Sequence, residues 1–367
     1  MKDIKVIISG GGTGGHIFPA LAIAGELKKR LPGCDILFVG AQGRMEMEKV
    51  PAAGYRITGL PVMGFPRKPG WAMVTFFIKL LRSMIASRRI VREFRPDLAI
   101  GVGGFASGPL LRAAIAHRVP ALIQEQNSYA GVTNKLLGKK VGIVCVAYSG
   151  MERFFPPEKI VLTGNPIRKN LLAPAGTRQE ALSSFGLSGE QQVVLITGGS
   201  LGARSLNDAV IAALEEIRKA PFAVIWQTGS LYFREMKEKT AANPPANLHI
   251  RQFLERMELA YLSADIVISR AGAGTISELC IAAKPVVLVP SPNVAEDHQT
   301  RNAMALVEKE AAIMVRDADI REKLLPTISA LLQDSGKMTS LSANIQKLAL
   351  PGATAHIVDE ALKLVSP

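Results

Sequence analysis

A pattern of apolar strand, glycine-rich turn and amphipathic helix occurs twice in this chain. The first copy lies in ISGGGTGGHIFPALAIAGEL (residues 8–27) and the second in VVLITGGSLGARSLNDAVIAAL (residues 193–214). We expect the first helix to span Pro19 to Leu27, with the glycines in the turn before it. Glycine permits positive φ and close approach of backbone N–H groups, and a helix N-terminus carries partial positive charge. The first turn therefore indicates an anion-binding site, and the repeat predicts two Rossmann-like halves.

Apolar segments that alternate with helical stretches extend the pattern along both halves. The candidate strands are Lys5–Ser9, Asp35–Val39, Leu98–Val102, Ala121–Gln124 and Ile143–Val146, then Val193–Thr197, Ala223–Gln227, His249–Arg251, Ile266–Ser269 and Val286–Val289. This alternation predicts two parallel sheets with crossover helices, an α/β class. We place the domain boundary near residue 164, which gives domains at 1–164 and 165–367. The last helix, Ala353 to Val365, could cross back onto the first domain.

The positive charge is confined to the first half of the chain. Residues 1–164 hold 23 Lys and Arg against 10 Asp and Glu, whereas residues 165–367 hold 21 of each. This asymmetry predicts an anionic partner for the first domain, with a merely soluble basic surface as the alternative. Aromatic residues are only 5% of the chain and form no recognised nucleic-acid module, so we expect no nucleic acid as partner.

The cysteines and the apolar runs predict the compartment. Three widely spaced cysteines favour a reducing, cytoplasmic setting. No apolar run approaches the roughly 18 residues of a membrane-spanning helix.

The glycine turns differ in what they can bind. Gly10, Gly12 and Gly15 fit a dinucleotide fingerprint, but the next strand ends FVGA without the carboxylate that would hold a ribose, so no nicotinamide or flavin cofactor is expected. The segment ISRAGAGTISE (residues 268–278) predicts a nucleotide site, with a helix from Thr275 whose N-terminus faces a diphosphate. Glu278 either clamps ribose hydroxyls or completes a capping box with Thr275.

Polar side chains follow other strands of both sheets, where open α/β sheets bind ligands. In the second half, SPNVAEDHQTRNA (residues 291–303) carries amides that suit sugar hydroxyls. In the first half, GVGGFASGP (residues 101–109) and IQEQNSYAGVTNKLL (residues 123–137) outline an acceptor-facing site. Asp317 and Asp319 are spaced like a metal-binding pair, but Asp319 fits a helix N-cap, so no metal is expected.

Together these motifs resemble one family, the MurG N-acetylglucosaminyltransferases of bacterial peptidoglycan synthesis. The segments that carry the resemblance are GGGTGGHIFPALAIA, GVGGFASGP, QEQNSYAGVTNKLL, TGNPIR, TGGSLGARSLN, SRAGAGTISE and EDHQTRNA, within residues 10–303. The resemblance implies the GT-B fold, two Rossmann-like doubly wound domains facing across a cleft. It also implies UDP-GlcNAc as donor, lipid I (undecaprenyl-pyrophosphoryl-MurNAc-pentapeptide) as acceptor, lipid II as product, and no cofactor.

The resemblance also assigns substrate-binding roles to residues of this sequence. It implies a glycine loop near the diphosphates at Thr13, Gly14 and Gly15, a donor-sugar contact at Asn127, a uracil-side contact at Arg168, a diphosphate contact at Ser200, a backbone contact to uracil at Leu254, the diphosphate turn at Ala273, Gly274 and Thr275, the ribose clamp at Glu278, and a GlcNAc contact at Gln299. Asn134 is a candidate for a different reason, because it belongs with Glu125 and Asn127 to the polar cluster that outlines the acceptor-facing site. Phe105 and Gln124 stand where some relatives have tyrosine and histidine, so neither is expected to do acid–base work. His298 stands where some relatives have glutamine.

The expected reaction is an inverting attack of the MurNAc 4-hydroxyl on the anomeric carbon, and it requires a base. Histidine titrates near neutrality, so His16 is the first candidate. The alternative is that His16 holds the turn or binds phosphate, and Glu125 is then the base. A UDP-GlcNAc 2-epimerase and a transferase with another acceptor are rival enzymes on this fold.

A long amphipathic helix is predicted from about Trp71, within residues 65–96. One face carries Val74, Phe77, Ile78, Leu81 and Ile85, and the basic residues Arg67, Lys68, Lys79, Arg82, Arg88, Arg89 and Arg92 lie largely elsewhere. The stripe by itself is more typical of a core face. Further apolar residues at Met73, Phe76, Leu80 and Met84 widen it, so we expect reversible, peripheral binding to the anionic cytoplasmic leaflet of the plasma membrane.

Overall fold

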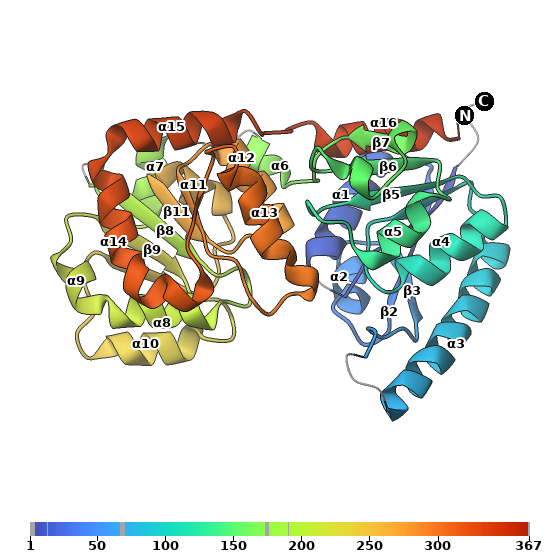
Figure 1. The fold of residues 1–367 in the computed structure, drawn as a ribbon, viewed down its shortest axis with the longest axis horizontal. Coiled ribbons are helices and arrows are strands. Elements are labelled where there is room, and N and C mark those ends of the chain that lie inside the picture. The colour runs from blue at the N-terminus through green and yellow to red at the C-terminus, as the bar shows by residue number, and fades with distance from the viewer. Residues whose placement is uncertain (1–3, 13, 67–69, 173–175, 190, 366–367) are drawn as a thin grey trace. The chain divides into compact units, whose positions relative to one another are not determined.

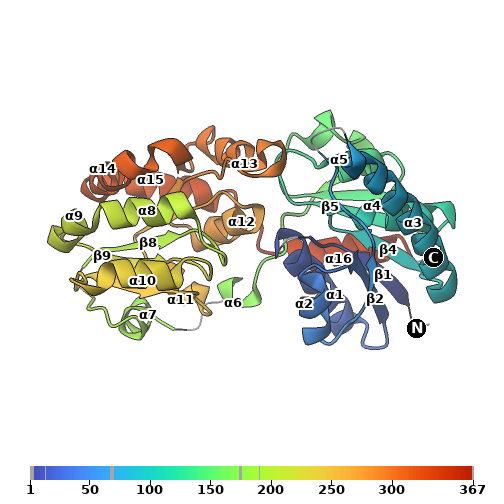
Figure 2. The same cartoon turned by 90° about the horizontal axis from the view of Figure 1, so that it is seen from below.

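The computed structural model describes residues 4–12, 14–66, 70–172, 176–189 and 191–365. The chain forms two compact units, Met1–Ile167 with Gly352–Pro367, and Arg168–Pro351. Each unit contains one parallel sheet with helices packed on its faces (Figure 1, Figure 2).

The first unit has a seven-stranded sheet of order β3-β2-β1-β4-β5-β6-β7. Its strands are β1 (Lys5–Ser9), β2 (Asp35–Ala41), β3 (Arg56–Leu60), β4 (Leu98–Gly101), β5 (Ala121–Glu125), β6 (Ile143–Val146) and β7 (Ile160–Leu162). Its helices are α1 (Gly14–Arg30), α2 (Glu46–Ala52), α3 (Trp71–Phe94), α4 (Ser107–Ala116), α5 (Val132–Gly138) and α16 (Ala353–Lys363), with 3₁₀ turns at Met151–Arg153 and Pro157–Lys159. The strand order reverses between β1 and β4, which is where such sheets bind ligands.

The second unit repeats this plan with six strands of order β10-β9-β8-β11-β12-β13. Its strands are β8 (Val193–Thr197), β9 (Ala223–Gln227), β10 (Leu248–Arg251), β11 (Ile266–Ser269), β12 (Val286–Leu288) and β13 (Ile313–Met314). Its helices are α6 (Lys169–Leu172), α7 (Arg178–Ser184), α8 (Arg204–Ala212), α9 (Leu214–Lys219), α10 (Phe233–Ala241), α11 (Met257–Ser263), α12 (Ala273–Ala282), α13 (His298–Val307), α14 (Ile320–Gln333) and α15 (Ser335–Gln346), with 3₁₀ turns at Ala295–Asp297 and Asp317–Asp319. Here the order reverses between β8 and β11.

The predicted strands are confirmed, five of them with the predicted ends and five with one end shifted by one or two residues. Three short strands were not predicted, namely β3, β7 and β13. Their residues are mostly half-buried, and β7 and β13 are only three and two residues long, so neither their burial nor their length is that of a fully buried parallel strand.

One predicted helix start is wrong. Helix α1 begins at Gly14 rather than Pro19, whereas α12 begins at Ala273, two residues before the predicted vicinity of Thr275. Pro19 removes one backbone hydrogen bond from α1, but Ile17, Ala20 and Ile23 bury their side chains in the core and offset that loss. Tertiary packing therefore overrides the local proline signal.

The last helix, α16, packs on α1 within the first unit (Figure 1). Ile357, Val358 and Ala361 are fully buried and join the core cluster that α1 forms with the sheet. On the surface, Arg30 of α1 pairs with Asp359 of α16.

Candidate functional site

Glu278 lies on α12, the helix that follows β11, and contacts two polar side chains. One belongs to Arg168, which was predicted, and the other to the buried Tyr261, which was not. Glu278 Oε1 is 3.2 Å from Nε of Arg168, and Glu278 Oε2 accepts a hydrogen bond from the hydroxyl of Tyr261 at 3.4 Å. Burial raises the pKa of Glu278 above its ordinary value, and the opposing effects of Arg168 and Tyr261 are smaller. The structure therefore brings the predicted ribose and uracil-side residues together. Tyr261 was not predicted, because a buried tyrosine inside a helix carries no local signal of a ligand site.

The capping-box interpretation of Glu278 is wrong. Helix α12 begins at Ala273 after the N-cap Gly272, and no side chain caps it. Glu278 consequently lies in the second turn, beyond the position that a capping box requires. The predicted diphosphate turn, Ala273 to Thr275, forms the first helical turn, so the positive end of the helix dipole lies at these residues.

Gln227, at the end of β9, organises the loops on either side of it. Its Nε2 donates to Thr197 Oγ1 and to the Gly199 carbonyl, both at 3.0 Å, and its Oε1 accepts from the Leu254 N–H at 2.8 Å. The Leu254 N–H is thus already used within the protein. Ser200 is exposed in the same loop as Gly199. Gln227 was missed because its role depends on loops distant in the sequence.

The loop after β12 is held by two amide side chains of α13. Gln299 Oε1 accepts a hydrogen bond from the Ser291 N–H at 2.8 Å. Asn302 is fully buried and donates to the Ala271 carbonyl at 3.3 Å. Asn302 therefore ties α13 to the segment just before α12, where the diphosphate turn was predicted.

The acidic pair near β13 is engaged in ion pairs. Asp317 pairs with Arg270 and accepts from Ser205 Oγ at 2.5 Å, while Asp319 pairs with Arg316 at 2.9 Å. Arg270 also donates to the carbonyls of Val289 and Pro290, so it crosses the ends of β11 and β12. Asp319 does stand at the N-cap of α14, but its side chain makes no capping bond, so that part of the prediction is wrong.

No group of three or more His, Cys, Asp or Glu that could hold a metal ion occurs among the described residues.

In the first unit, Glu125 at the end of β5 organises the loop that follows it. Its Oε1 accepts from the Asn127 N–H at 3.0 Å and the Asn127 amide at 3.3 Å, and its Oε2 accepts from the Gly131 N–H at 3.0 Å and Asn134 Nδ2 at 2.9 Å. Glu125 is only 2% exposed, and this burial raises the pKa of its carboxyl despite those bonds. Glu125, Asn127 and Asn134 thus form one hydrogen-bonded cluster. Asn134 Oδ1 is buried without a partner among the described residues.

His16 lies in the first turn of α1, with Gly14 and Gly15, rather than in the loop before the helix. Thr13 lies outside the described residues. The His16 ring packs against Gly103, where a Cβ atom would come within 2.8 Å of His16 Cδ2. Gln126 also faces Gly103, so loops after β1, β4 and β5 meet at the carboxyl edge of this sheet.

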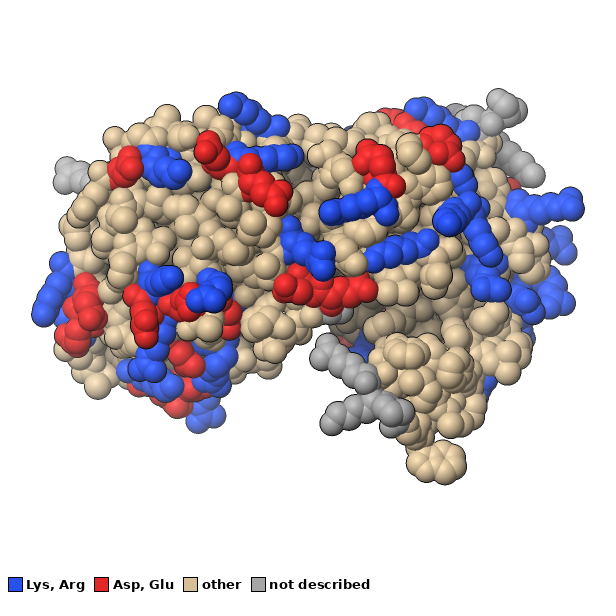
Figure 3. All heavy atoms as spheres, viewed as in Figure 1, with Lys and Arg blue, Asp and Glu red and all other residues tan. Residues whose placement is uncertain are grey.

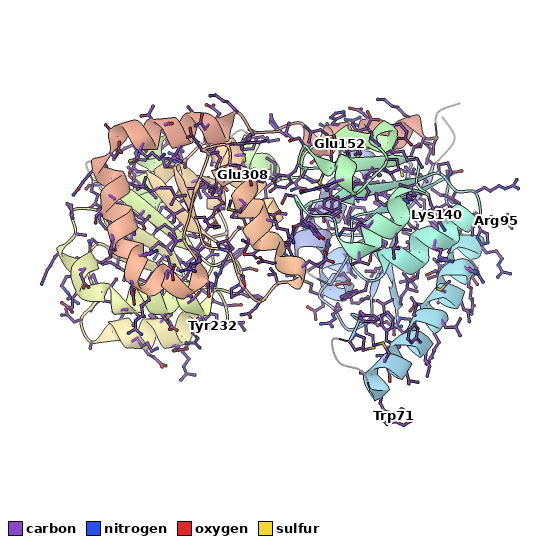
Figure 4. The ribbon with its side chains drawn as sticks, viewed as in Figure 1. Trp71, Arg95, Lys140, Glu152, Tyr232 and Glu308 are labelled. Carbon is purple, nitrogen blue, oxygen red and sulfur yellow. The ribbon has the colours of Figure 1, made fainter. Side chains whose placement is uncertain are left out.

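Helix α3 presents its predicted apolar stripe to solvent, so the core interpretation of that stripe is wrong. Val74, Phe77, Ile78, Leu81 and Ile85 are between 49% and 60% exposed, and Trp71 is 87% exposed at the end of the helix (Figure 4). The buried side chains of α3 are Ser83, Ser87 and Val91. The helix packs on α4, and its first turns carry most of the exposed apolar side chains. The periodicity of a stripe is the same whether it faces a core or another surface.

Basic side chains surround the C-terminal half of α3 and its neighbour α4 (Figure 3). A hollow of about 300 Å³ between the two helices is lined by Met84, Arg88, Pro109, Arg112 and Lys140, among others. Among the described residues, no acidic side chain pairs with these three cations. Arg67 and Lys68 lie outside the part of the chain that the structure describes. None of the described helices is both long enough and apolar enough to cross a bilayer.

Known proteins match this chain over almost its full length. The glycosyltransferase family 28 N-terminal domain matches residues 6–145, and the family 28 C-terminal domain matches residues 193–356. A UDP-N-acetylglucosamine–N-acetylmuramyl-(pentapeptide) pyrophosphoryl-undecaprenol N-acetylglucosamine transferase of Bacteroides fragilis is 56% identical over 98% of this chain and 96% of its own length. A protein of the same name from Parabacteroides distasonis is 53% identical over 100% and 99%. The crystal structure of Acinetobacter baumannii MurG has a TM-score of 0.80 at 31% identity, covering 98% of this chain and 99% of that one. The chain belongs to the MurG family.

The MurG assignment also confirms the α/β GT-B fold that the resemblance implied. A UDP-N-acetylglucosamine 2-epimerase has a TM-score of 0.66 at 16% identity, over 99% of this chain and 96% of that one. That likeness reflects the fold alone, whereas the relatives from Bacteroides fragilis and Parabacteroides distasonis are 56% and 53% identical to this chain over nearly its full length.

Proposed function

We propose that this MurG-family protein transfers GlcNAc from UDP-GlcNAc to the 4-hydroxyl of MurNAc in lipid I, giving lipid II for peptidoglycan synthesis. The observation that carries this proposal is the identity of 53% and 56% with relatives named for this transfer, over nearly the whole chain. The cluster of Glu278, Arg168 and Tyr261 beside the α12 N-terminus supports binding of the donor by the second unit.

The donor is held through three kinds of contact in this proposal. Glu278 accepts hydrogen bonds from the ribose hydroxyls, with Arg168 and the carbonyl of Leu254 on the uracil side. The first turn of α12, Ala273 to Thr275, and the loop at Ser200 bind the diphosphate, and Gln299 donates to a GlcNAc hydroxyl. As the bond to the anomeric carbon breaks, UDP leaves with the electron pair, and the helix dipole stabilises its growing negative charge.

The acceptor side belongs to the first unit in this proposal. His16 takes the proton of the MurNAc 4-hydroxyl as that oxygen attacks the anomeric carbon from the face opposite UDP, which inverts the configuration. Three of the four hydrogen bonds to the Glu125 carboxylate come from the loop after β5 and the fourth from Asn134 on α5, so Glu125 shapes the segment that presents Asn127 and Asn134 to the substrates. This leaves His16 as the better placed base.

Purified protein with UDP-GlcNAc and lipid I tests this function. We expect UDP release and formation of a disaccharide-linked lipid only when both substrates are present. An epimerase would instead convert the donor without acceptor, and a transferase with another acceptor would leave lipid I unchanged. Either of those results would overturn the proposal.

We also propose that α3 docks the protein on the cytoplasmic face of the plasma membrane, where the lipid-linked acceptor resides. The exposed apolar residues from Trp71 to Ile85 would enter the interface, and the cations around the α3–α4 hollow would meet anionic headgroups. Each cation near an anionic lipid surface adds about 1 kcal/mol to the binding free energy. A single apolar anchor gives only weak, reversible membrane binding, so the cations and the apolar residues are both needed. The binding is therefore reversible and salt-sensitive.

Vesicle co-sedimentation tests the docking proposal. Binding should rise with anionic lipid content, fall with salt, and weaken when Arg88, Arg89 and Arg92 are changed to Gln. The change Phe77→Ser should weaken binding without lowering Tm, because Phe77 is 58% exposed. If the wild-type protein ignores anionic vesicles at low salt, α3 does not dock on membranes.

A further inference from the structure

Glu46 is a buried carboxylate without a cationic partner among the described residues. It is the first residue of α2 and has no exposed surface. Acidic side chains are almost never buried unless a cation or several hydrogen bonds compensate the charge. The groups that compensate the buried charge of Glu46 must therefore lie within hydrogen-bonding distance of its carboxylate.

The compensation comes from the first glycine turn. The Gly12 N–H donates to both carboxylate oxygens of Glu46 at 3.0 Å, and the Ala41 N–H donates to Oε1 at 2.9 Å. Gly12 has a φ of +87°, which turns its N–H in a way that other residues rarely allow. A strand end, a glycine turn and a helix N-terminus are the elements that hold phosphate in many proteins. Here a carboxylate of the same chain takes that place.

The surrounding backbone leaves room for this side chain. A Cβ atom at Gly11 would overlap the Glu46 carboxylate, and one at Gly40 would overlap its Cγ. The side chain thus reaches between the ends of β1 and β2, where glycines line its path. The backbone of Gly104 packs in turn against Gly11, so the Glu46 contacts also set the position of the loop after β4.

We propose that Glu46 is the resident anion of the turn at residues 10–12, and that it is a positioning residue for His16. A substrate phosphate at the Gly12 N–H would have to displace a buried carboxylate, so this N–H is not available to the acceptor diphosphate. His16 lies four residues after Gly12 and packs on Gly103, next to the loop that Gly11 supports. By fixing the turn, Glu46 therefore fixes both the start of the helix that carries His16 and the Gly103–Gly104 loop against which its ring packs. This role of His16 rests on the proposed function, whereas the anion site does not.

The anion site is tested by thermal unfolding of the Glu46→Ala variant with formate as probe. Removal of the side chain opens a carboxylate-sized space with two free N–H donors, so formate should raise Tm by at least about 2 °C in a concentration-dependent way. Sodium chloride at equal ionic strength should not. Wild-type protein and Glu48→Ala should show no such difference, because Glu48 lies on the same helix but is exposed. A Glu46→Ala variant that responds like Glu48→Ala would overturn the assignment.

The positioning role is tested by kinetics with both substrates. The Glu46→Ala variant should lose about 10- to 100-fold in kcat, the range expected when hydrogen bonds to a charged group are lost. Formate should restore part of the lost kcat, and the affinity for UDP-GlcNAc should be unchanged. If the alanine variant does not fold, Glu46→Gln takes its place, because glutamine keeps the volume of the side chain. The glutamine variant should lose activity, because its NH₂ group replaces the oxygen that accepts only from the Gly12 N–H, and it should ignore formate, because the amide still fills the space. Wild-type kcat in Glu46→Gln would refute the positioning role. If the wild-type protein transfers no GlcNAc, the proposed function fails while the formate result still stands.

Discussion

Replacement of Glu278 by Gln should weaken donor binding and leave the fold intact. Glutamine keeps the size of the side chain and one acceptor oxygen for the Tyr261 hydroxyl, which is 3% exposed. It removes the charge and turns the second oxygen into an NH₂ group, which cannot accept a ribose hydroxyl. Glu278→Ala would in addition leave the buried Tyr261 hydroxyl without its acceptor, which costs about 1–3 kcal/mol and lowers Tm. Glutamine is therefore the variant that separates binding from stability.

The size of the effect follows from the two hydroxyl contacts. A hydrogen bond to a charged group contributes about 1 kcal/mol more than one to a neutral group, and one of the two acceptors is lost altogether. The sum of about 2–3 kcal/mol corresponds to a rise in donor KM of about 30- to 150-fold. The ion pair with Arg168, whose side chain is 44% exposed, contributes at most about 1 kcal/mol to stability. The Tm should therefore fall by no more than about 2–4 °C.

Steady-state kinetics with varied UDP-GlcNAc measures this change, and Glu308→Gln at the exposed end of α13 is the matched control (Figure 4). Burial raises the pKa of Glu278, and ribose hydroxyls bind its ionised form. As pH falls through this raised pKa, the donor KM should therefore rise, at a higher pH than for an exposed carboxyl. The Gln variant should lack this dependence. An unchanged donor KM in Glu278→Gln would refute the ribose clamp.

The other substitutions probe the base and the ion pair behind the donor turn. His16→Ala should lower turnover by about 10²- to 10⁴-fold while UDP-GlcNAc still binds, as calorimetry would show, and activity within a few-fold of wild type would exclude His16 as base. Asp317→Asn should weaken donor binding by about tenfold or more, because it leaves the Arg270 guanidinium, whose side chain is only 14% exposed, without its counter-charge. Asp319→Asn, which breaks only a surface ion pair, should leave donor affinity unchanged, and equal effects of the two variants would contradict this reasoning.

The strands of both sheets were predictable because buried parallel strands are short continuous apolar runs. β1, β8 and β11 show this directly, since almost every residue in them is buried. β13 consists of only two half-buried residues within the apolar segment AAIMV, and its pairing with β12 is what defines it as a strand. Helix α3 was predicted at its correct start, but its sequence could not tell which side meets α4.

The residues of the candidate site also fall into two groups, those that local sequence motifs reveal and those that only the folded structure reveals. The motifs around Glu278 and Gln299 could be found because glycine turns and polar clusters follow strands within a few residues. Glu46, Gln227, Arg270 and Tyr261 could not be found in this way. Each acts on a backbone or side-chain group 17 to 47 residues away in the chain.

The sequence by itself determined the two α/β units, their glycine turns, the excess positive charge of the first half and the membership of the MurG family. These are properties of short segments, which local periodicity and motif spacing record. Only the tertiary structure decided which anion occupies the first glycine turn, what holds Glu125 and Glu278, and that the apolar face of α3 is exposed. Those outcomes depend on which distant groups the packed sheets bring within hydrogen-bonding distance, and no single stretch of the chain encodes them.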